Sequence, residues 1–250
     1  SGTPHRATKT SASRSMTRDE SIIELGSWLR TPPGAYTMAW EQDRLDHAVA
    51  DAFGYHALQL GMPELEGLRA NRMPHRWVGC ESVEPPPSAG EPMPRAAVAL
   101  NLDFAALPFD SASLDLVVLP HTLEMARDPH QTLREVERVL VPEGRVVIVG
   151  FNPASLWALR QRMGRLFHGR DSARALFMPR ASDFIGYWRL RDWLRLLSLE
   201  VVLGRFGCWR PPWRSAGLLQ RGTWIERAGA ISLAAVVVGR FRSLVGTLVG

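Results

Sequence analysis

The chain has 250 residues, 46% of them apolar, so it can bury one substantial core and has the size of one large domain. No apolar run approaches the roughly 18 residues that a membrane-spanning helix needs. The two cysteines, Cys80 and Cys208, lack the spacing of a metal site or a disulfide scaffold, which is typical of a reducing compartment. We therefore expect a cytoplasmic protein without a membrane span.

The formal charge is divided unevenly along the chain. Residues 1–150 contain 14 Lys and Arg against 20 Asp and Glu, a charge of −6, whereas residues 151–250 contain 16 against 5, a charge of +11. A basic half of this kind can bind RNA, an anionic membrane surface or an acidic protein. It can equally be a solvated face without such a partner.

The N-terminal part predicts a flexible segment followed by helices. Residues 1–20 are rich in Ser, Thr and Arg and poor in apolar residues, so we expect no ordered structure there. Apolar residues then recur at helical spacing in 21–29 and 41–53, and Gly54 is placed to end the second helix. From residue 21 onward we expect one domain, 21–250.

Five short apolar runs bounded by polar turns predict strands at 56–60, 76–80, 96–102, 114–120 and 145–151. Such runs are typical of a sheet that is covered on both faces. The stretch 81–95 is too rich in Pro for a helix, whereas 129–140 has one apolar face and Asp128 as its N-cap. The pattern indicates a parallel α/β sheet.

An Arg- and Trp-rich elaboration, about 152–230, follows the fifth strand. Its periodicity predicts helices at 155–167 and 189–197 and a strand at 199–206, with a last strand at 231–238. Six of the nine tryptophans lie in this half. They can stack on bases, or they can pack in the core and against Arg side chains.

Asp103 is the first candidate for a binding role. It stands at the end of the third predicted strand, and ligands of open parallel sheets lie at the carboxyl ends of the strands. A carboxylate there can accept a hydrogen bond from an exocyclic amine, while the N–H of the next residue can donate to a ring nitrogen. The pair could recognise adenine, or Asp103 could simply cap a turn.

The stretch from Leu102 to Pro153 resembles the class I S-adenosylmethionine-dependent methyltransferases of the type 11 group. It contains, in order, an Asp, "LPF", "DSASLDLV", a His after the fourth strand, "DPHQTLREVERVLVPEG" and the strand that closes the pattern. The resemblance implies a Rossmann-like fold with a mostly parallel central sheet, helices on both faces and an antiparallel last strand. It also implies S-adenosylmethionine as the cofactor and a methyl acceptor as the partner.

The same resemblance implies which residues contact the cofactor. Asp103 and Phe104 match the adenine-contacting pair, and Leu119 and Pro120 match the stretch that lies along the cofactor. The acid expected to hold the ribose hydroxyls is Glu81 or Glu84, and the sequence does not decide between them.

The first motif of the family is altered in this chain. Gln59 stands where the family has an acid two residues before the first glycine, and Gly61 is kept. Pro63 and Leu65 occupy the places of later glycines, although only a residue without Cβ lets the backbone approach the amino acid part of the cofactor closely. This motif raises the question of whether the cofactor site is reshaped or lost.

His121 is the candidate catalytic residue. Imidazole suits removal of a proton from an oxygen or nitrogen nucleophile near neutral pH, although a lone His at a strand end can also be structural. We expect an S-adenosylmethionine-dependent methyltransferase acting on a small molecule or on RNA. The alternative is a protein that keeps the fold, has lost catalysis and serves as a binding or scaffold module.

Overall fold

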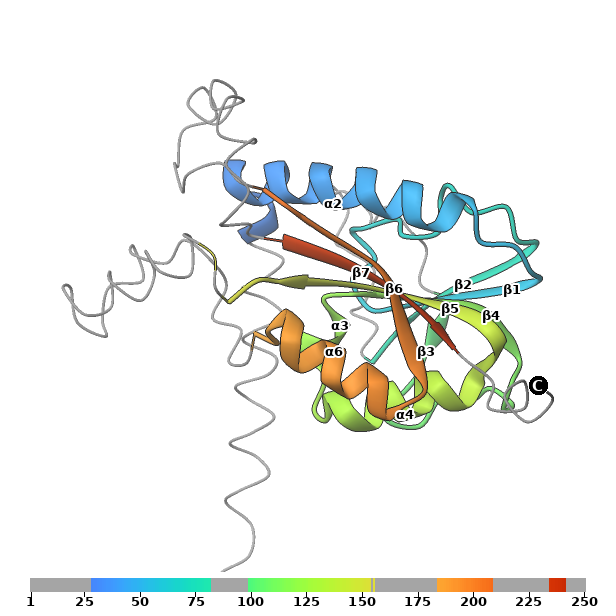
Figure 1. Ribbon diagram of the computed structural model, residues 1–250. Helices are drawn as coiled ribbons and strands as arrows, with labels where there is room; N and C mark the ends of the chain where they lie inside the picture. The colour runs from blue at the N-terminus through green and yellow to red at the C-terminus, as the bar shows by residue number, and fades with distance from the viewer. Residues whose placement is uncertain (1–27, 82–98, 154, 156–183, 209–233, 242–250) are drawn as a thin grey trace, which may run out of the picture.

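The computed structural model describes residues 28–81, 99–153, 155, 184–208 and 234–241 (Figure 1). Its elements, in chain order, are α2 (Pro32–Ala50), β1 (His56–Leu60), β2 (His75–Cys80), β3 (Leu100–Asn101), β4 (Leu114–Pro120), α3 (Thr122–Met125), α4 (Pro129–Val139), β5 (Leu140–Phe151), α6 (Tyr187–Leu196), β6 (Leu199–Gly207) and β7 (Ala234–Phe241). The described strands form one sheet in the order β3-β2-β1-β4-β5-β7-β6.

The sheet has the predicted topology. Strands β1 to β5 pair in parallel, and β7 lies antiparallel between β5 and β6. Helix α2 covers one face of the sheet, and α3, α4 and α6 lie on the other (Figure 1). The expected Rossmann-like architecture with helices on both faces and an antiparallel last strand is therefore confirmed.

Most predicted boundaries agree with the structure. The strands predicted at 56–60 and 114–120 are observed with those bounds as β1 and β4. Strand β5 extends back to Leu140. In the described part of 96–102, only Leu100–Asn101 pairs as a strand.

Several predictions fall on residues that the structure does not describe. These are the flexible segment 1–20, nearly all of the helix at 21–29, the Pro-rich loop beyond Glu81, all but the first residue of the helix at 155–167 and much of the 152–230 elaboration. The extent of the single domain stays a prediction for the same reason.

Helix α2 begins well before its predicted start at residue 41. Thr31 caps it by accepting a hydrogen bond from the N–H of Gly34, and prolines occupy its first positions, where a missing N–H costs nothing. The helix ends at Ala50 with Asp51 as its C-cap, so the prediction that Gly54 ends it is wrong. Gly54 instead lies against Asp115, whose carboxylate accepts hydrogen bonds from the next two backbone N–H groups.

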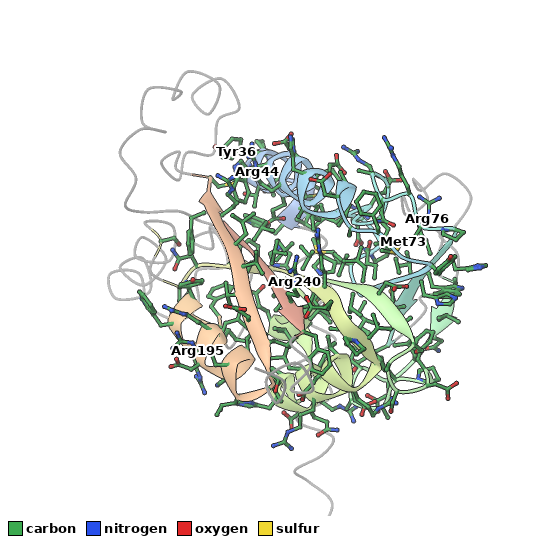
Figure 2. The ribbon with its side chains drawn as sticks, turned by 45° about the vertical axis from the view of Figure 1, so that its right-hand side comes forward. Tyr36, Arg44, Met73, Arg76, Arg195 and Arg240 are labelled. Atoms are coloured by element: carbon green, nitrogen blue, oxygen red, sulfur yellow. The ribbon has the colours of Figure 1, made fainter. Side chains whose placement is uncertain are left out.

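Successive residues of each strand point to opposite faces, which divides the core into two clusters. In β1, Ala57 faces α2, and Leu58 faces the helices of the other layer. Figure 2 shows side chains filling the space between the sheet and α2, on which Tyr36 and Arg44 are labelled. The other face is filled from α4 and α6 by Leu133, Val136, Val139, Leu190 and Leu194.

The connection between β1 and β2 contains no helix, although every residue from 61 to 74 is described. Its apolar side chains Met62, Leu65, Leu68 and Met73 cover the α2 face of the sheet in place of a crossover helix. In the described parts of the chain, no helix has the length and apolar character needed to cross a membrane.

Candidate functional site

The strand order reverses between β1 and β4. The chain proceeds from β1 outward to β2 and β3, and from β4 outward to β5 on the other side. In open α/β sheets the crevice at the carboxyl ends of such a strand pair is where ligands bind. The residues that follow β1, β2, β3 and β4 at this edge include Gly61, Glu81, Asp103 and His121.

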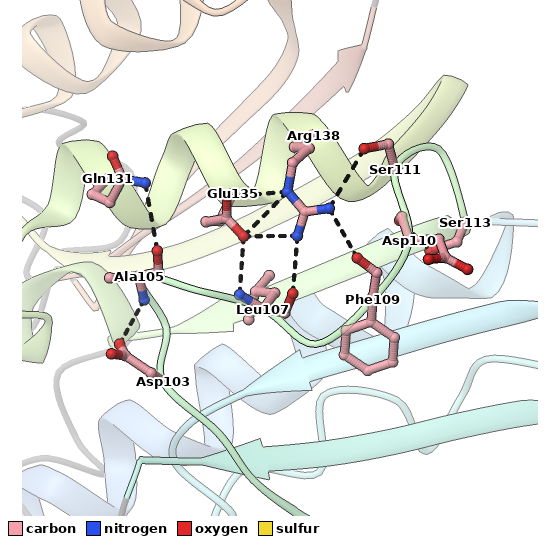
Figure 3. Close-up of polar contacts among 10 residues, drawn as sticks. All are labelled: Asp103, Ala105, Leu107, Phe109, Asp110, Ser111, Ser113, Gln131, Glu135 and Arg138. Carbon is pink, nitrogen blue, oxygen red and sulfur yellow. Dashed lines mark hydrogen bonds and ion pairs between the residues drawn. The ribbon is translucent and has the colours of Figure 1, made fainter.

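Three of the predicted cofactor residues meet at the ends of β2 and β3. The backbone N–H of Phe104 is directed at Glu81 Oε1, at 3.4 Å, so the Glu81 side chain reaches the loop that follows β3. The side chain of Asp103 is exposed, and its Oδ1 accepts a hydrogen bond from the N–H of Ala105 at 2.8 Å (Figure 3). Asp103 thus caps a turn and also presents its carboxylate at the edge of the sheet. Glu84, the alternative to Glu81, lies outside the described residues.

The "LPF" segment after Asp103 is clamped to helix α4 (Figure 3). Arg138 donates to the carbonyl oxygens of Leu107 and Phe109, both at 2.9 Å. Glu135 accepts from the N–H of Leu107 at 2.9 Å and pairs with Arg138 at 2.8 Å. The hydrogen bonds from Arg138 lower the pKa of Glu135, so this carboxylate is charged at neutral pH. The "E..R" pattern of the helix therefore fixes the loop that carries Asp103.

Gln59 is fully buried and fastens the loop after β1. Its Nε2 donates to the carbonyl oxygens of Gly61, Met62 and Leu65, at 3.2, 3.0 and 2.7 Å. Its Oε1 accepts from the N–H of Gly67 at 2.8 Å, and a Cβ at Gly67 would lie only 2.9 Å from that oxygen. A carboxylate cannot donate to carbonyl groups, so the amide is the chemical group that this loop conformation requires.

Gly61 keeps the left-handed backbone of a tight turn, with φ of 77°, and Met62 follows with φ of 44°. Both residues are buried. A Cβ at Gly61 would lie 3.5 Å from the ring of Phe104 and from the hydroxyl of Thr122. The Thr122 hydroxyl donates to the carbonyl of Leu60, which joins the end of β1 to the turn after β4.

Leu119 and Pro120, the remaining predicted cofactor residues, are buried within β4. They pair with Ile148 and Val149 of β5, so they lie inside the sheet, directly before its carboxyl edge. Their contact with the cofactor stays a prediction.

His121 lies between two carboxylates and has no exposed surface. Its Nε2 is 3.1 Å from Glu41 Oε1 on α2, and its Nδ1 is 2.7 Å from Glu124 Oε2 on α3. The ring of Phe151 is 4.3 Å from the imidazole ring, centroid to centroid. Glu124 also accepts from the N–H of Phe151 at 2.6 Å, so this buried cluster joins α2, the end of β4 and the end of β5.

The cluster strongly shifts the pKa of its histidine. Burial alone lowers the pKa of His121, but the charges and hydrogen bonds of Glu41 and Glu124 outweigh it and raise the pKa to about 10. Burial also raises the pKa of Glu124, against the opposing effect of His121. At neutral pH the imidazole is a buried cation, and a protonated ring has no lone pair with which to accept a proton. This geometry favours a structural ion-pair role, and the role of His121 as a base stays a prediction.

A small hollow of about 30 Å³, partly open to solvent, lies beside this cluster. It is bounded by α3, the end of β5, α6 and β6, and most of its lining is apolar. Glu124, Asn152 and Tyr187 are its polar members. Its position next to the switch edge suits the non-cofactor reactant of a group transfer.

Sequence reasoning missed Glu41, Thr122 and Glu124. Glu41 is 80 residues from His121 in the sequence, and no local pattern connects the two. The contact of Glu124 with His121 could have been predicted from the sequence, because side chains three residues apart meet on a helix and α3 begins directly after His121.

The strand order of the sheet, with β7 antiparallel between β5 and β6, is that of the class I methyltransferase architecture. A family model described as "Methyltransferase domain" matches residues 81–148. The Escherichia coli protein YafS is 30% identical over 231 residues, which cover 92% of this chain and 86% of YafS.

Solved structures share the fold at low identity. A chain of the Haloferax volcanii complex that contains the methyltransferase activator Trm112 superposes with a TM-score of 0.54 and 18% identity, covering 90% of this chain and 97% of that one. The Thermotoga maritima S-adenosylmethionine-dependent methyltransferase TM1293 does so with a TM-score of 0.53 and 13% identity, over 91% and 99%. The chain therefore belongs to the same family as YafS, and it has the fold of the class I S-adenosylmethionine-dependent methyltransferases.

S-adenosylmethionine is the cofactor of the class I methyltransferases. The described residues fit its adenosine part better than its amino acid part. Asp103, the N–H of Phe104 and Glu81 have the chemistry to hold adenine and ribose. At the other end, the turn at Gly61 is covered by Phe104, and the loop carbonyls are bonded to Gln59.

Proposed function

We infer that the chain transfers a methyl group from S-adenosylmethionine to a small-molecule or RNA acceptor. The observation that supports this most is the meeting of Glu81 with the loop that carries Asp103 and Phe104, next to the switch between β1 and β4. These residues come from two segments that the sheet brings together, and their donors and acceptors match those of adenosine.

When bound, the cofactor supplies an electrophilic methyl group on a sulfonium. The protein's part is to hold the two reactants in line and to exclude water. Asp103 and Phe104 would fix the adenosine, and the clamp of Arg138 and Glu135 holds their loop rigid. The small apolar hollow beside Glu124 would receive the reacting group of the acceptor.

Calorimetric titration with S-adenosylmethionine and S-adenosylhomocysteine tests the cofactor assignment. Saturable heat with both ligands is the expected result. An absence of heat at millimolar ligand would reject the enzyme and leave the scaffold alternative.

Replacing Asp103 with alanine should weaken binding of S-adenosylhomocysteine by roughly 1–3 kcal/mol, because the adenine partners are left unpaired. Asp110, an exposed acid on the same connection, provides the matched control, since Asp110→Ala removes a charge without touching the adenine position. Equal affinity of Asp103→Ala and Asp110→Ala would remove Asp103 from the site.

A second candidate function is a binding or scaffold role without catalysis. Two features favour it: the turn at Gly61 is buried, and Gln59 bonds to the loop from within the protein. Both reduce access to the part of the loop that contacts the cofactor in class I methyltransferases. A protein that binds S-adenosylhomocysteine but transfers no methyl group to any acceptor from a cell extract would support this alternative.

RNA is the proposed polyanionic acceptor, on the basis of the basic C-terminal half. On α6 the Trp188 side chain is 70% exposed, and the Arg191 guanidinium lies 5.6 Å from its ring. Exposed aromatic and Arg side chains can stack on bases. Retention on immobilised RNA that weakens as salt rises is expected, and no retention at low salt would reject the RNA acceptor.

A cytoplasmic location is proposed from the cysteines. Cys80 and Cys208 are both buried, and neither forms a disulfide. Burial raises the pKa of the Cys80 thiol to about 11, so it is a poor nucleophile at neutral pH. Fractionation of cells that produce the protein would check the location.

A further inference from the structure

The backbone of residues 61–67 has few free groups to offer a ligand. The carbonyls of Gly61, Met62 and Leu65 already receive hydrogen bonds from Gln59. The loop N–H groups that are bonded within the protein belong to Gly61, Leu65, Glu66 and Gly67, whose acceptors are Gly79, Met62, Gln42 and Gln59. Since buried backbone groups are usually paired, most of the polar backbone groups of this loop are satisfied from within the protein.

Two further features reduce what the loop can donate. Pro63 has no N–H, which leaves Met62 and Glu64 as the residues of the loop whose N–H groups make none of the bonds given above. No helix begins in the described connection 61–74. The end of β1 therefore lacks the cluster of free N–H groups that a helix N-terminus would direct at a carboxylate.

Access to the turn is also restricted. Gly61 and Met62 are buried, and the Phe104 ring and the Thr122 hydroxyl lie at van der Waals distance from the position that a Cβ at Gly61 would take. An amino acid moiety carries an ammonium and a carboxylate, which need acceptors and donors in contact with them. The covered turn presents few of them: the N–H groups of Met62 and Glu64 and the carboxylate of Glu64.

The ends of β2 and β3 differ in this respect. The Asp103 carboxylate is exposed, and the N–H of Phe104 makes only a long contact, 3.4 Å, with Glu81. The Asp103 carboxylate and the N–H of Phe104 can therefore form hydrogen bonds to a nucleoside. At the end of β1, most polar backbone groups are bonded within the protein and the turn is buried. At the ends of β2 and β3, polar groups are still able to bind a ligand.

We propose that this chain recognises its cofactor through the adenosine moiety and that the amino acid moiety adds little to affinity. The proposal rests on the function proposed above and specifies how that site selects its ligand. In this proposal Gln59 determines which ligands bind, because its amide already donates hydrogen bonds to the loop carbonyls that would otherwise accept from the ligand's ammonium group. Nucleosides with a 5′-thioether, such as 5′-methylthioadenosine, should therefore bind to the same site.

The test compares S-adenosylhomocysteine with 5′-methylthioadenosine, which lacks the amino acid moiety, by calorimetry on the full chain. We expect affinities within about tenfold of each other, whereas a bound ammonium and carboxylate would favour S-adenosylhomocysteine by about a hundredfold or more. Asp103→Ala should weaken both ligands by the same factor, and Asp110→Ala should weaken neither.

The outcomes separate the two proposals. Tight S-adenosylhomocysteine binding with a preference of a hundredfold or more over 5′-methylthioadenosine overturns this inference and leaves the methyltransferase standing. Failure of both ligands and of adenosine to bind at millimolar concentration overturns the cofactor site itself. Competition between the two ligands for one site, with similar affinities, supports the inference.

Discussion

Replacing His121 with asparagine is expected to lower the free energy of unfolding by about 3–5 kcal/mol at pH 7, because it leaves two buried carboxylates without their cation. Glu41 and Glu124 are both buried, and one oxygen of Glu41 has no hydrogen-bond partner in the described structure. Asparagine is chosen because it tolerates the left-handed backbone of His121, whose φ is 53°. The loss of free energy of unfolding then reflects the removal of the imidazolium and not backbone strain.

The effect should depend on pH in a defined direction. The pKa of His121 is raised from its ordinary value of 6.5 to about 10. Its contribution to stability is therefore fully present below pH 6.5 and is lost as the pH rises through about 10. The raised pKa of Glu124 acts in the same direction, because the folded state holds that proton more tightly than the unfolded state. Wild-type stability should fall between pH 7 and pH 10, and His121→Asn should lack most of this fall.

Urea denaturation followed by tryptophan fluorescence measures both quantities. His47 provides the control, since its side chain is 73% exposed and His47→Asn should change stability by less than about 0.5 kcal/mol. If the two variants were equally stable, the buried ion-pair cluster would not hold α2 to the sheet.

Periodicity and capping predicted the framework of this fold. The bounds of β1 and β4 were predicted because each is a continuous apolar run between polar turns. Helix α4 was predicted because Asp128 and Pro129 mark its start. Such signals lie within a few neighbouring residues, so a single sequence contains them in full.

The site was only partly predictable, because its decisive contacts join distant segments. Asp103 and Phe104 could be placed at a strand end, and Glu81 could be named as one of two acids. The contact between Glu81 and the N–H of Phe104 depends on the register in which β2 and β3 pair, which no local pattern reveals. The partnership of Glu41 with His121 was missed for the same reason.

Gln59 shows why a departure from a family pattern is hard to interpret from sequence. As a missing acid it suggested a lost or reshaped site. In the structure it is a donor to the carbonyls of the loop, in the same segment where Pro63 removes an N–H. The two departures belong to one loop conformation that is stabilised from within the protein.

Restoring the family's acid by Gln59→Glu is therefore expected to damage the protein. The new carboxylate would be fully buried, could not donate to the carbonyls of Gly61, Met62 and Leu65, and would be repelled by them. An unpaired buried charge of this kind costs about 3–5 kcal/mol, so the free energy of unfolding should fall by that amount at pH 7. Lowering the pH should recover part of the loss, since a protonated carboxyl can donate one hydrogen bond.

Gln131→Glu is the matched control for this variant. Gln131 lies in the first turn of α4, is only half-buried and donates one long hydrogen bond, 3.4 Å, to the carbonyl of Ala105, so a new negative charge there should change the free energy of unfolding by less than about 1 kcal/mol. Denaturation of both variants at pH 7 and pH 5 separates the effect of charge from the effect of position. If Gln59→Glu were as stable as wild type and bound S-adenosylhomocysteine more tightly, the loop would be open to the cofactor, and the self-satisfied conformation described here would not be the one that functions.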